Sequence, residues 1–210
     1  MNAALLTLTD SRLPAGGHAH SGGVEQAIAA GIVSDPASLS GFLRRRLVTA
    51  GAVAAGLAAA ACGADAERLA ELDAEADART PSPALRTASR QQGRGLVRVG
   101  RRAWPSADWD ALPALPHHPI ALGVAAAAGG LTPRDAAQAA AYLSISGPAT
   151  AAQRLLAMDP LTVAAVTARL SAEVDAVAAA SVNGLPGATD PLLDLLAEVH
   201  AARKDRFFAS

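Results

Sequence analysis

The sequence predicts an all-α fold, a bundle of roughly eight to ten helices joined by short loops. Three observations support this prediction: capping residues repeatedly precede proline, apolar residues recur at helical spacing, and no segment alternates convincingly as a strand. The 210 residues contain no obvious linker and no internal repeat. We therefore expect residues 1–210 to form a single domain with its own core, in which residues 203–210 are a C-terminal tail.

Helix starts are marked by a capping side chain followed by proline. Ser, Thr and Asp accept hydrogen bonds from first-turn N–H groups, and proline has no N–H to leave unpaired there. The pattern occurs at Ser34-Asp35-Pro36, Ser82-Pro83, Thr132-Pro133, Asp159-Pro160 and Asp190-Pro191. Stop signals lie at Gly31, Gly63, Gly129-Gly130 and Asn183-Gly184. Together they predict helices over residues 3–9, 22–30, 36–62 (with a break near Gly51), 65–78, 83–102, 119–129, 133–144, 147–157, 160–182 and 191–204.

The core is expected to consist of small and aliphatic side chains. Hydrophobic residues make up 51% of the chain, but aromatic residues only 3%. Leu39, Leu43 and Leu47 recur at four-residue intervals, as expected for the buried face of a helix. A core built from Ala, Leu and Val favours helices that approach one another closely.

Charge, cysteine content and hydropathy narrow the function classes. A formal net charge of -1 gives no general attraction to nucleic acid or to an anionic membrane, so we expect neither as a partner. The single Cys62 excludes an internal disulfide and fits a reducing compartment. The N-terminus lacks the apolar core of a signal peptide, and the most apolar window, residues 47–62, is shorter than the roughly 20 residues that span a bilayer. We therefore expect a cytoplasmic protein.

Residues 10–25 are the one stretch where polar, turn-forming and titratable side chains crowd together. On spacing alone, His18 and His20 are compatible with metal ligands, and Ser21 beside His20 suggests a nucleophile and its base. The structural alternative is that Asp10 and Ser21 cap helices while the histidines pack locally. Both interpretations remain open at the level of sequence.

Arginines recur every four residues along one predicted helix, at Arg86, Arg90, Arg94 and Arg98. This spacing places them on one helix face. The stripe fits an acidic partner protein, or it pairs with the acidic helix around Glu67, Glu71 and Glu75. Arg44-Arg45-Arg46, in contrast, spreads over about 200 degrees of helix surface and is interpreted as a solvated face.

Two further groups of residues are candidates for function. His117-His118 precedes an alanine-rich helix, where adjacent imidazoles either bind metal with ligands from elsewhere or cap and pack. Phe207 and Phe208 lie at the very end of the chain, where they dock on this protein or on another one. Phosphate loops and serine-hydrolase elbows are absent from the sequence.

Four motifs, in chain order, resemble the urease accessory protein F (UreF) family. Residues 10–25, Asp-Ser-Arg-Leu-Pro-Ala-Gly-Gly-His-Ala-His-Ser-Gly-Gly-Val-Glu, resemble that family's D-S-x-x-P-x-G-x-F-S-H-S-x-G-L-E signature. Residues 86–94 resemble its R-x-A-S-x-x-Q-G-R helix, and residues 117–123 resemble H-H-P-V-A-F-G. Residues 190–210 are similar to its H-E-x-x-x-x-R-L-F-R-S terminus. The resemblance therefore extends over the chain from end to end.

The resemblance implies an all-α, non-enzymatic scaffold without a resident cofactor, which helps to deliver nickel to urease. In that family the protein, as a dimer, joins urease accessory protein D (H in some species) and recruits the accessory GTPase G. Nickel bound by the GTPase then passes to the urease apoprotein. Regulation of the GTPase is also implied by the resemblance.

This chain departs from the family pattern at several positions. His18 and Ala19 stand where the family has Phe and Ser, Ala201 where it has Glu, and Ala209 where it has Arg. Residues 146–159 lack the expected Gly-Gln-rich pattern. We expect contacts made through these positions in relatives to be altered here.

From the matching motifs we predict which residues bind partners: Asp10, Pro14, Gly16, His20, Ser21, Glu25, Arg90, Gln92, Arg94, His200, Arg206, Phe207 and Phe208. In this hypothesis Arg206, Phe207 and Phe208 anchor the D-type partner, while the loop and the tail brace one another or line a contact surface. Nickel in transit would touch His20, His117, His118 and His200, although structural roles for these histidines are favoured.

Two other functions remain open from the sequence. One is a metal-dependent or serine hydrolase that uses His18, His20, Ser21 and the His117-His118 pair. The other is a helical regulator of a GTPase that is unrelated to urease.

Overall fold

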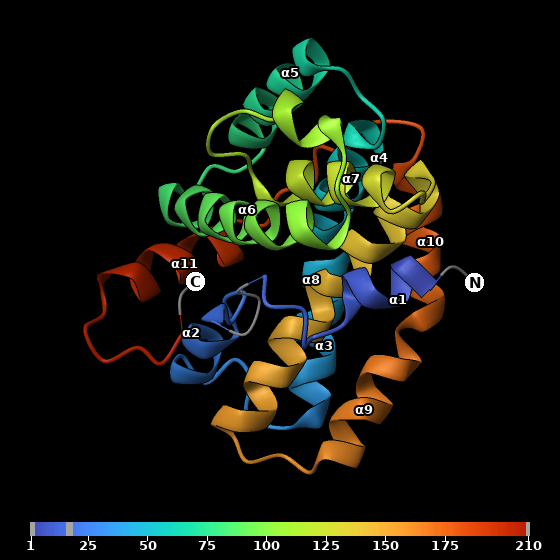
Figure 1. Ribbon diagram of the computed structural model, residues 1–210. Coiled ribbons are helices and arrows are strands. Elements are labelled where there is room, and N and C mark those ends of the chain that lie inside the picture. The colour runs from blue at the N-terminus through green and yellow to red at the C-terminus, as the bar shows by residue number, and fades with distance from the viewer. Residues whose placement is uncertain (1–2, 16–18, 209–210) are drawn as a thin grey trace.

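Helix α8 (Pro133–Leu155) passes through the middle of the molecule and contacts α1, α2, α3, α4, α7, α9 and α10 (Figure 1). The structure is a computed structural model that describes residues 3–15 and 19–208. Within these residues every regular element is helical and no strand is formed, which confirms the all-α prediction.

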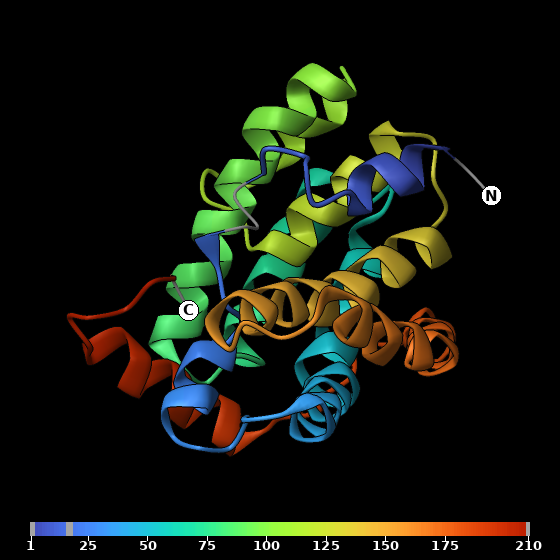
Figure 2. The same cartoon turned by 90° about the horizontal axis from the view of Figure 1, so that it is seen from below.

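The other helices pack against α8 or against helices that contact it. They are α1 (Ala3–Thr9), α2 (Val24–Ala29), α3 (Pro36–Arg46), α4 (Ala52–Ala61), α5 (Ala66–Ala78), α6 (Pro83–Ala103), α7 (His118–Ala128), α9 (Pro160–Arg169), α10 (Ser171–Ser181) and α11 (Pro191–Ala202). A π-helical segment (Leu47–Gly51) joins α3 to α4, and a 3-10 helix (Ala107–Ala111) lies in the connection between α6 and α7. Seen from below, α11 and α9 lie on opposite sides of the molecule (Figure 2).

The five helix starts predicted from a capping residue followed by proline are confirmed. Each of the capping residues at the five predicted starts accepts a hydrogen bond from a first-turn N–H group: Asp35, Ser82, Thr132, Asp159 and Asp190. At Asp35 and Thr132 the side chain of the third helical residue also bonds back to the cap, which completes a capping box.

Small residues bring the core helices together. A Cβ on Gly123 of α7 would lie 2.5 Å from the carbonyl oxygen of Ala58 on α4. A Cβ on Gly51 would lie 2.6 Å from the hydroxyl of Ser144, where the π-helical segment crosses α8. These contacts leave no room for a side chain, so glycine sets the close helix packing that the composition predicts.

The predicted division between helices 133–144 and 147–157 is wrong, because α8 is continuous and contains Pro148. Proline has no N–H to donate to the carbonyl four residues earlier, which belongs to Ser144. Arg46 of α3 replaces that donor, since its Nε lies 2.9 Å from the Ser144 oxygen. A side chain from another helix therefore satisfies the carbonyl freed at the proline.

The opposite error occurs over residues 160–182, which form two helices instead of one. The chain turns at Leu170, where φ is -86° and ψ is -3°, so the backbone leaves the helical ψ range. Leu170 is buried at this turn. No helix in the described part of the chain combines the length and apolarity needed to cross a membrane.

Candidate functional site

Glu25, in the first turn of α2, holds the C-terminal tail. Its carboxylate is buried and accepts hydrogen bonds from the backbone N–H of Phe207 at 2.8 Å and of Phe208 at 2.9 Å. Residues more than 180 positions apart in sequence are thereby joined by one side chain. The predicted contact between the loop and the tail is made here, at the last residue of the loop.

His200 completes this arrangement from α11. Its Nε2 lies 3.0 Å from Oε2 of Glu25, and both side chains are buried. Burial by itself raises the pKa of the Glu25 carboxyl, but the bonds from Phe207, His200 and Phe208 outweigh that effect and lower it. Glu25 is therefore ionised at neutral pH, and its negative charge is stabilised by three hydrogen bonds.

The same arrangement leaves apolar side chains in solvent. Phe207 is 83% exposed, and Leu195 and Val199 on the outer face of α11 are 65% and 52% exposed. Leu195 and Val199 are four residues apart, so they lie on one helix face. We call Leu195, Val199 and Phe207 the tail patch. Arg206, the residue before Phe207, is exposed, and among the described residues it donates only to the carbonyl of Ala201.

The arginine stripe on α6 is divided between two environments. Arg90 donates to Asp73 at 2.9 Å and to Asp77 at 2.6 Å. Helix α5 therefore pairs with α6, as one interpretation of the sequence expected. The pairing uses these aspartates instead of Glu67, Glu71 and Glu75. Arg94 is exposed and forms no ion pair with the described residues. The partner-binding role of Arg90 and Arg94 stays a prediction.

The two adjacent histidines point in different directions. His117 is buried, with Nδ1 3.0 Å from the Ser89 hydroxyl and Nε2 2.8 Å from Asp77. Both ring nitrogens are used within the fold, which favours the structural interpretation of this residue. Both histidines border a cavity, and the backbone N–H of His118 donates to the Ser89 hydroxyl.

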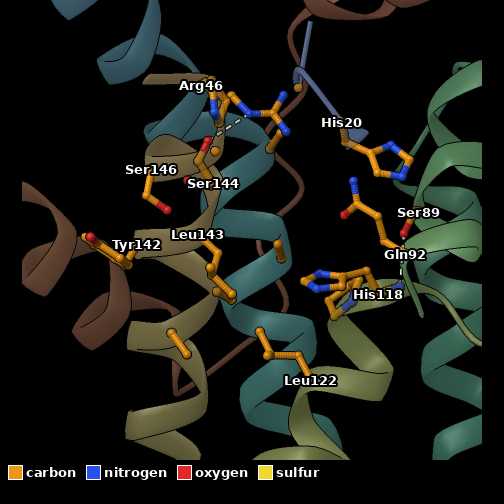
Figure 3. A pocket seen from close by; sticks show the side chains of 18 of the residues that line it. His20, Arg46, Ser89, Gln92, His118, Leu122, Tyr142, Leu143, Ser144 and Ser146 are labelled. Carbon is orange, nitrogen blue, oxygen red and sulfur yellow. Dashed lines mark hydrogen bonds between the residues drawn. The ribbon is translucent and has the colours of Figure 1, made fainter. Parts of the chain in front are cut away.

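This cavity has a volume of about 1140 Å³ and opens between α3, α6, α7 and α8 (Figure 3). His20, Arg46, Gln92 and His118 contribute polar groups to it. Burial lowers the pKa of His118 to about 4, and the neighbouring His20 adds to this lowering by charge repulsion. His118 is therefore neutral at pH 7.

The structure contains no complete metal site within the described residues. No three or more His, Cys, Asp or Glu side chains are grouped so that they could hold an ion. His117 and His200 use ring nitrogens in hydrogen bonds, and His20, His117 and His118 border the cavity. Contact of nickel in transit with these histidines stays a prediction.

The loop from Asp10 to Glu25 is described only in part. Asp10 bonds to the backbone and guanidinium of Arg12, directly after α1. Pro14 is exposed, while Gly16 and His18 lie outside the described residues. Gly22 has φ +58°, and a Cβ there would lie 2.7 Å from Pro148, so the loop rests on the proline of α8.

Ser21 does not play either of the roles considered from the sequence. Helix α2 has Gly23 as its N-cap and no side-chain cap, so Ser21 does not cap it. The Ser21 hydroxyl is fully buried and bonds to no described residue, so no described base is placed to activate it as a nucleophile. Ser21 and His20 therefore do not form the nucleophile–base pair considered from the sequence.

Two functional features were not predicted. Arg46 belongs to a triplet that the spacing assigns to solvent, and Arg44 and Arg45 are indeed exposed, in ion pairs with Glu173 and Asp190. Arg46 alone turns inward, because it meets the carbonyl opposite Pro148. The second feature is the identity of the acidic partners: pairing of α5 with α6 was one interpretation of the sequence, but Asp73 and Asp77 were not named for it.

Comparisons with known proteins agree with the motifs and the fold. A family model described as UreF matches residues 33–171. The chain belongs to the UreF family. It is 54% identical to the urease accessory protein UreF of Mycolicibacterium vanbaalenii over 99% of this chain and 98% of that protein. It is also 54% identical to the protein of the same name from Mycobacterium marinum, with the same coverage, and 48% identical to that from Mycobacterium tuberculosis. The chain is therefore a urease accessory protein by family, as the resemblance implied.

Proposed function

We propose that the chain is a non-catalytic, cytoplasmic scaffold that joins the D/H-type accessory protein to the accessory GTPase G during nickel insertion into urease. It works as a homodimer in this proposal and carries no resident cofactor. Nickel is the cargo of the complex. Family membership supports the general role, and the placement of the tail supports the specific partner contact.

The tail patch is the observation on which the partner contact rests. A phenylalanine in solvent is unfavourable for an isolated chain, by roughly 1.5–3 kcal/mol relative to burial. Here the Phe207 backbone is fixed by Glu25, so the ring is held in solvent by a defined backbone and not left on a loose end. A preorganised aromatic side chain with a neighbouring arginine is typical of the residues that dominate protein interfaces.

Nickel contact in this proposal is confined to the cavity. His20 and His118 line it, and a neutral His118 keeps a nitrogen lone pair for a metal ion at pH 7. A route for cargo needs weak binding, which agrees with the lack of a closed ligand set among the described residues. The proposal would fail here if nickel titration of the isolated protein revealed a tight site that depends on these histidines.

Co-elution in size-exclusion chromatography tests the scaffold role. The D/H-type accessory protein of the same organism is mixed with the full chain or with a chain that ends at Lys204. We expect the full chain to co-elute and the shortened chain to elute separately, because it lacks Phe207 and the bonds to Glu25.

Two controls make this experiment decisive. Leu161→Ala removes a side chain that is 80% exposed on α9, across the molecule from α11 (Figures 1 and 2), and co-elution should be retained. If both chain lengths co-elute, the partner binds elsewhere and the tail hypothesis is wrong. If neither does with a folded partner, the proposed scaffold role is wrong.

A further inference from the structure

Arg46 carries a positive charge that nothing in the described part of the chain neutralises. Its Nε donates to the Ser144 carbonyl, but Nη1 and Nη2 donate to no described residue, and no described carboxylate lies within 4.0 Å. Burial lowers the pKa of Arg46 to about 10, so the guanidinium stays charged at neutral pH although it is partly removed from water. An unpaired, partly buried charge is costly unless a ligand or water compensates it.

The carboxylates that line the same cavity do not supply this compensation, because none forms an ion pair with Arg46 and four of the five are bound to another group. Asp10 pairs with Arg12, Asp190 with Arg45, Asp175 with Gln138, and Asp135 with Thr132. Asp194, the remaining acid, interacts with the backbone of Ser82. The electrostatic balance at Arg46 is therefore positive even though acids occur along the cavity wall.

Other hydrogen-bond donors face the guanidinium across the cavity. Figure 3 shows Gln92 of α6 and His118 of α7 reaching into the cavity from the side opposite Arg46. Neither side chain forms a hydrogen bond with a described residue. The ring of His118 is close enough to His20 for the charge of His20 to lower its pKa. An amide NH2 group and a neutral imidazole N–H are both donors to an anion.

The backbone holds Arg46 in this position. Gly22 lies against the guanidinium, where a Cβ would be 3.3 Å from Cζ, and the Nε bond to Ser144 fixes the other edge. The fork of Nη1 and Nη2 is left to point towards the cavity (Figure 3). A planar guanidinium fixed at Nε with two free N–H edges matches the geometry with which arginine binds carboxylate and phosphate groups.

We propose that the Arg46 end of this cavity binds a small oxyanion, a ligand whose phosphate or carboxylate group accepts from Arg46, with Gln92 and His118 as further donors. The cavity is large enough for more than the anionic group itself. The site is independent of the tail patch, so it stands or fails separately from the proposed partner contact.

Thermal unfolding at constant ionic strength tests this site. Inorganic phosphate, sulfate or acetate is titrated against sodium chloride as the reference salt. A ligand that binds only the folded chain raises Tm, by roughly 2–4 °C at about five times its dissociation constant for a chain of this size. A response to phosphate and sulfate identifies a phosphate-type ligand, and a response to acetate alone identifies a carboxylate. No response to any of the three overturns the proposal.

Matched variants locate the response. Arg46→Gln removes the charge but keeps an amide donor for the Ser144 carbonyl, and the Tm increase should disappear. Arg44→Gln removes a neighbouring arginine that is paired with Glu173 on the surface, and the increase should remain. An unchanged increase in Arg46→Gln would show that the anion binds elsewhere. If circular dichroism shows that Arg46→Gln is unfolded, Gln92→Ala decides instead, with a reduced increase expected and an unchanged one contradicting the site.

Discussion

Two partly or fully buried charges, on Glu25 of α2 and on Arg46 of α3, differ in how far the chain compensates them. Around Glu25 the buried carboxylate has three donors, and the His200 ring and the tail backbone are used to provide them. Around Arg46 the guanidinium has one acceptor and two nitrogens without any among the described residues. Hydrogen bonds within the chain compensate the charge at Glu25, whereas no described residue compensates the charge at Arg46. We propose an anionic ligand only for the second.

Glu25→Ala should have the largest effect on stability. It removes the carboxylate that accepts from His200 and from the N–H groups of Phe207 and Phe208, and each buried donor left without an acceptor costs about 1–3 kcal/mol. Urea unfolding measures the loss, and limited proteolysis should show cleavage near the released tail. A loss below about 1 kcal/mol would mean that the tail is not held by this residue.

Arg46→Ala should cost less, about 1–3 kcal/mol, because it removes the donor of one carbonyl. A double-mutant cycle with Pro148→Ala tests whether this cost comes from the donor that is missing at the proline. Alanine at 148 supplies the missing N–H to the Ser144 oxygen, so Arg46→Ala should be less destabilising in that background. Equal costs in both backgrounds would contradict the capping role of Arg46.

The unfolding free energy should depend on pH through the Glu25 carboxyl. The folded-state pKa of Glu25 is lowered from 4.5, so its stabilisation is present above that pH and is lost as the pH falls through the lower folded-state value. Glu25→Gln should therefore flatten the decline of unfolding free energy below about pH 4.5, by at most about 1.4 kcal/mol per pH unit for one proton. Identical slopes in the two proteins would show that Glu25 is not preferentially ionised in the folded state.

His118→Ala should have the smallest effect, below about 1 kcal/mol, since its ring borders a cavity and bonds to no described residue. His200→Ala is the matched comparison, because that ring is fully buried and bonded to Glu25. It should be several times more destabilising in the same urea titration. Equal losses would mean that the two histidines do not differ as the structure indicates.

The helix starts were predictable because the signal is local. Asp35, Ser82 and Thr132 cap helices through residues within three positions of themselves, so neighbouring sequence contains the whole interaction. The continuity of α8 was not predictable in this way. Pro148 is tolerated inside it because Arg46, about 100 positions earlier, supplies a donor. That compensation becomes visible only when the helices are placed in space.

The candidate site shows the same limit. The motif that ends at Glu25 was identified from the sequence, as were His200 and the terminal phenylalanines. Their mutual hydrogen bonds depend on α2 and α11 packing together, which no local pattern specifies. Arg46 was assigned to a solvated face because three consecutive arginines cannot all face one way. The pattern was correct for two of them and could not show which one turns inward.

The affinity of the chain for the D/H-type accessory protein is the most direct test of the central claim, that Glu25 fixes a tail whose exposed Phe207 binds this partner. Titration calorimetry would compare the unmodified chain with Phe207→Ala and with Leu161→Ala, which removes a similarly exposed side chain on α9. We expect Phe207→Ala to raise Kd by about 30-fold or more, as for an interface residue worth about 2 kcal/mol, and Leu161→Ala to leave it unchanged. Equal affinities for all three proteins would contradict the claim.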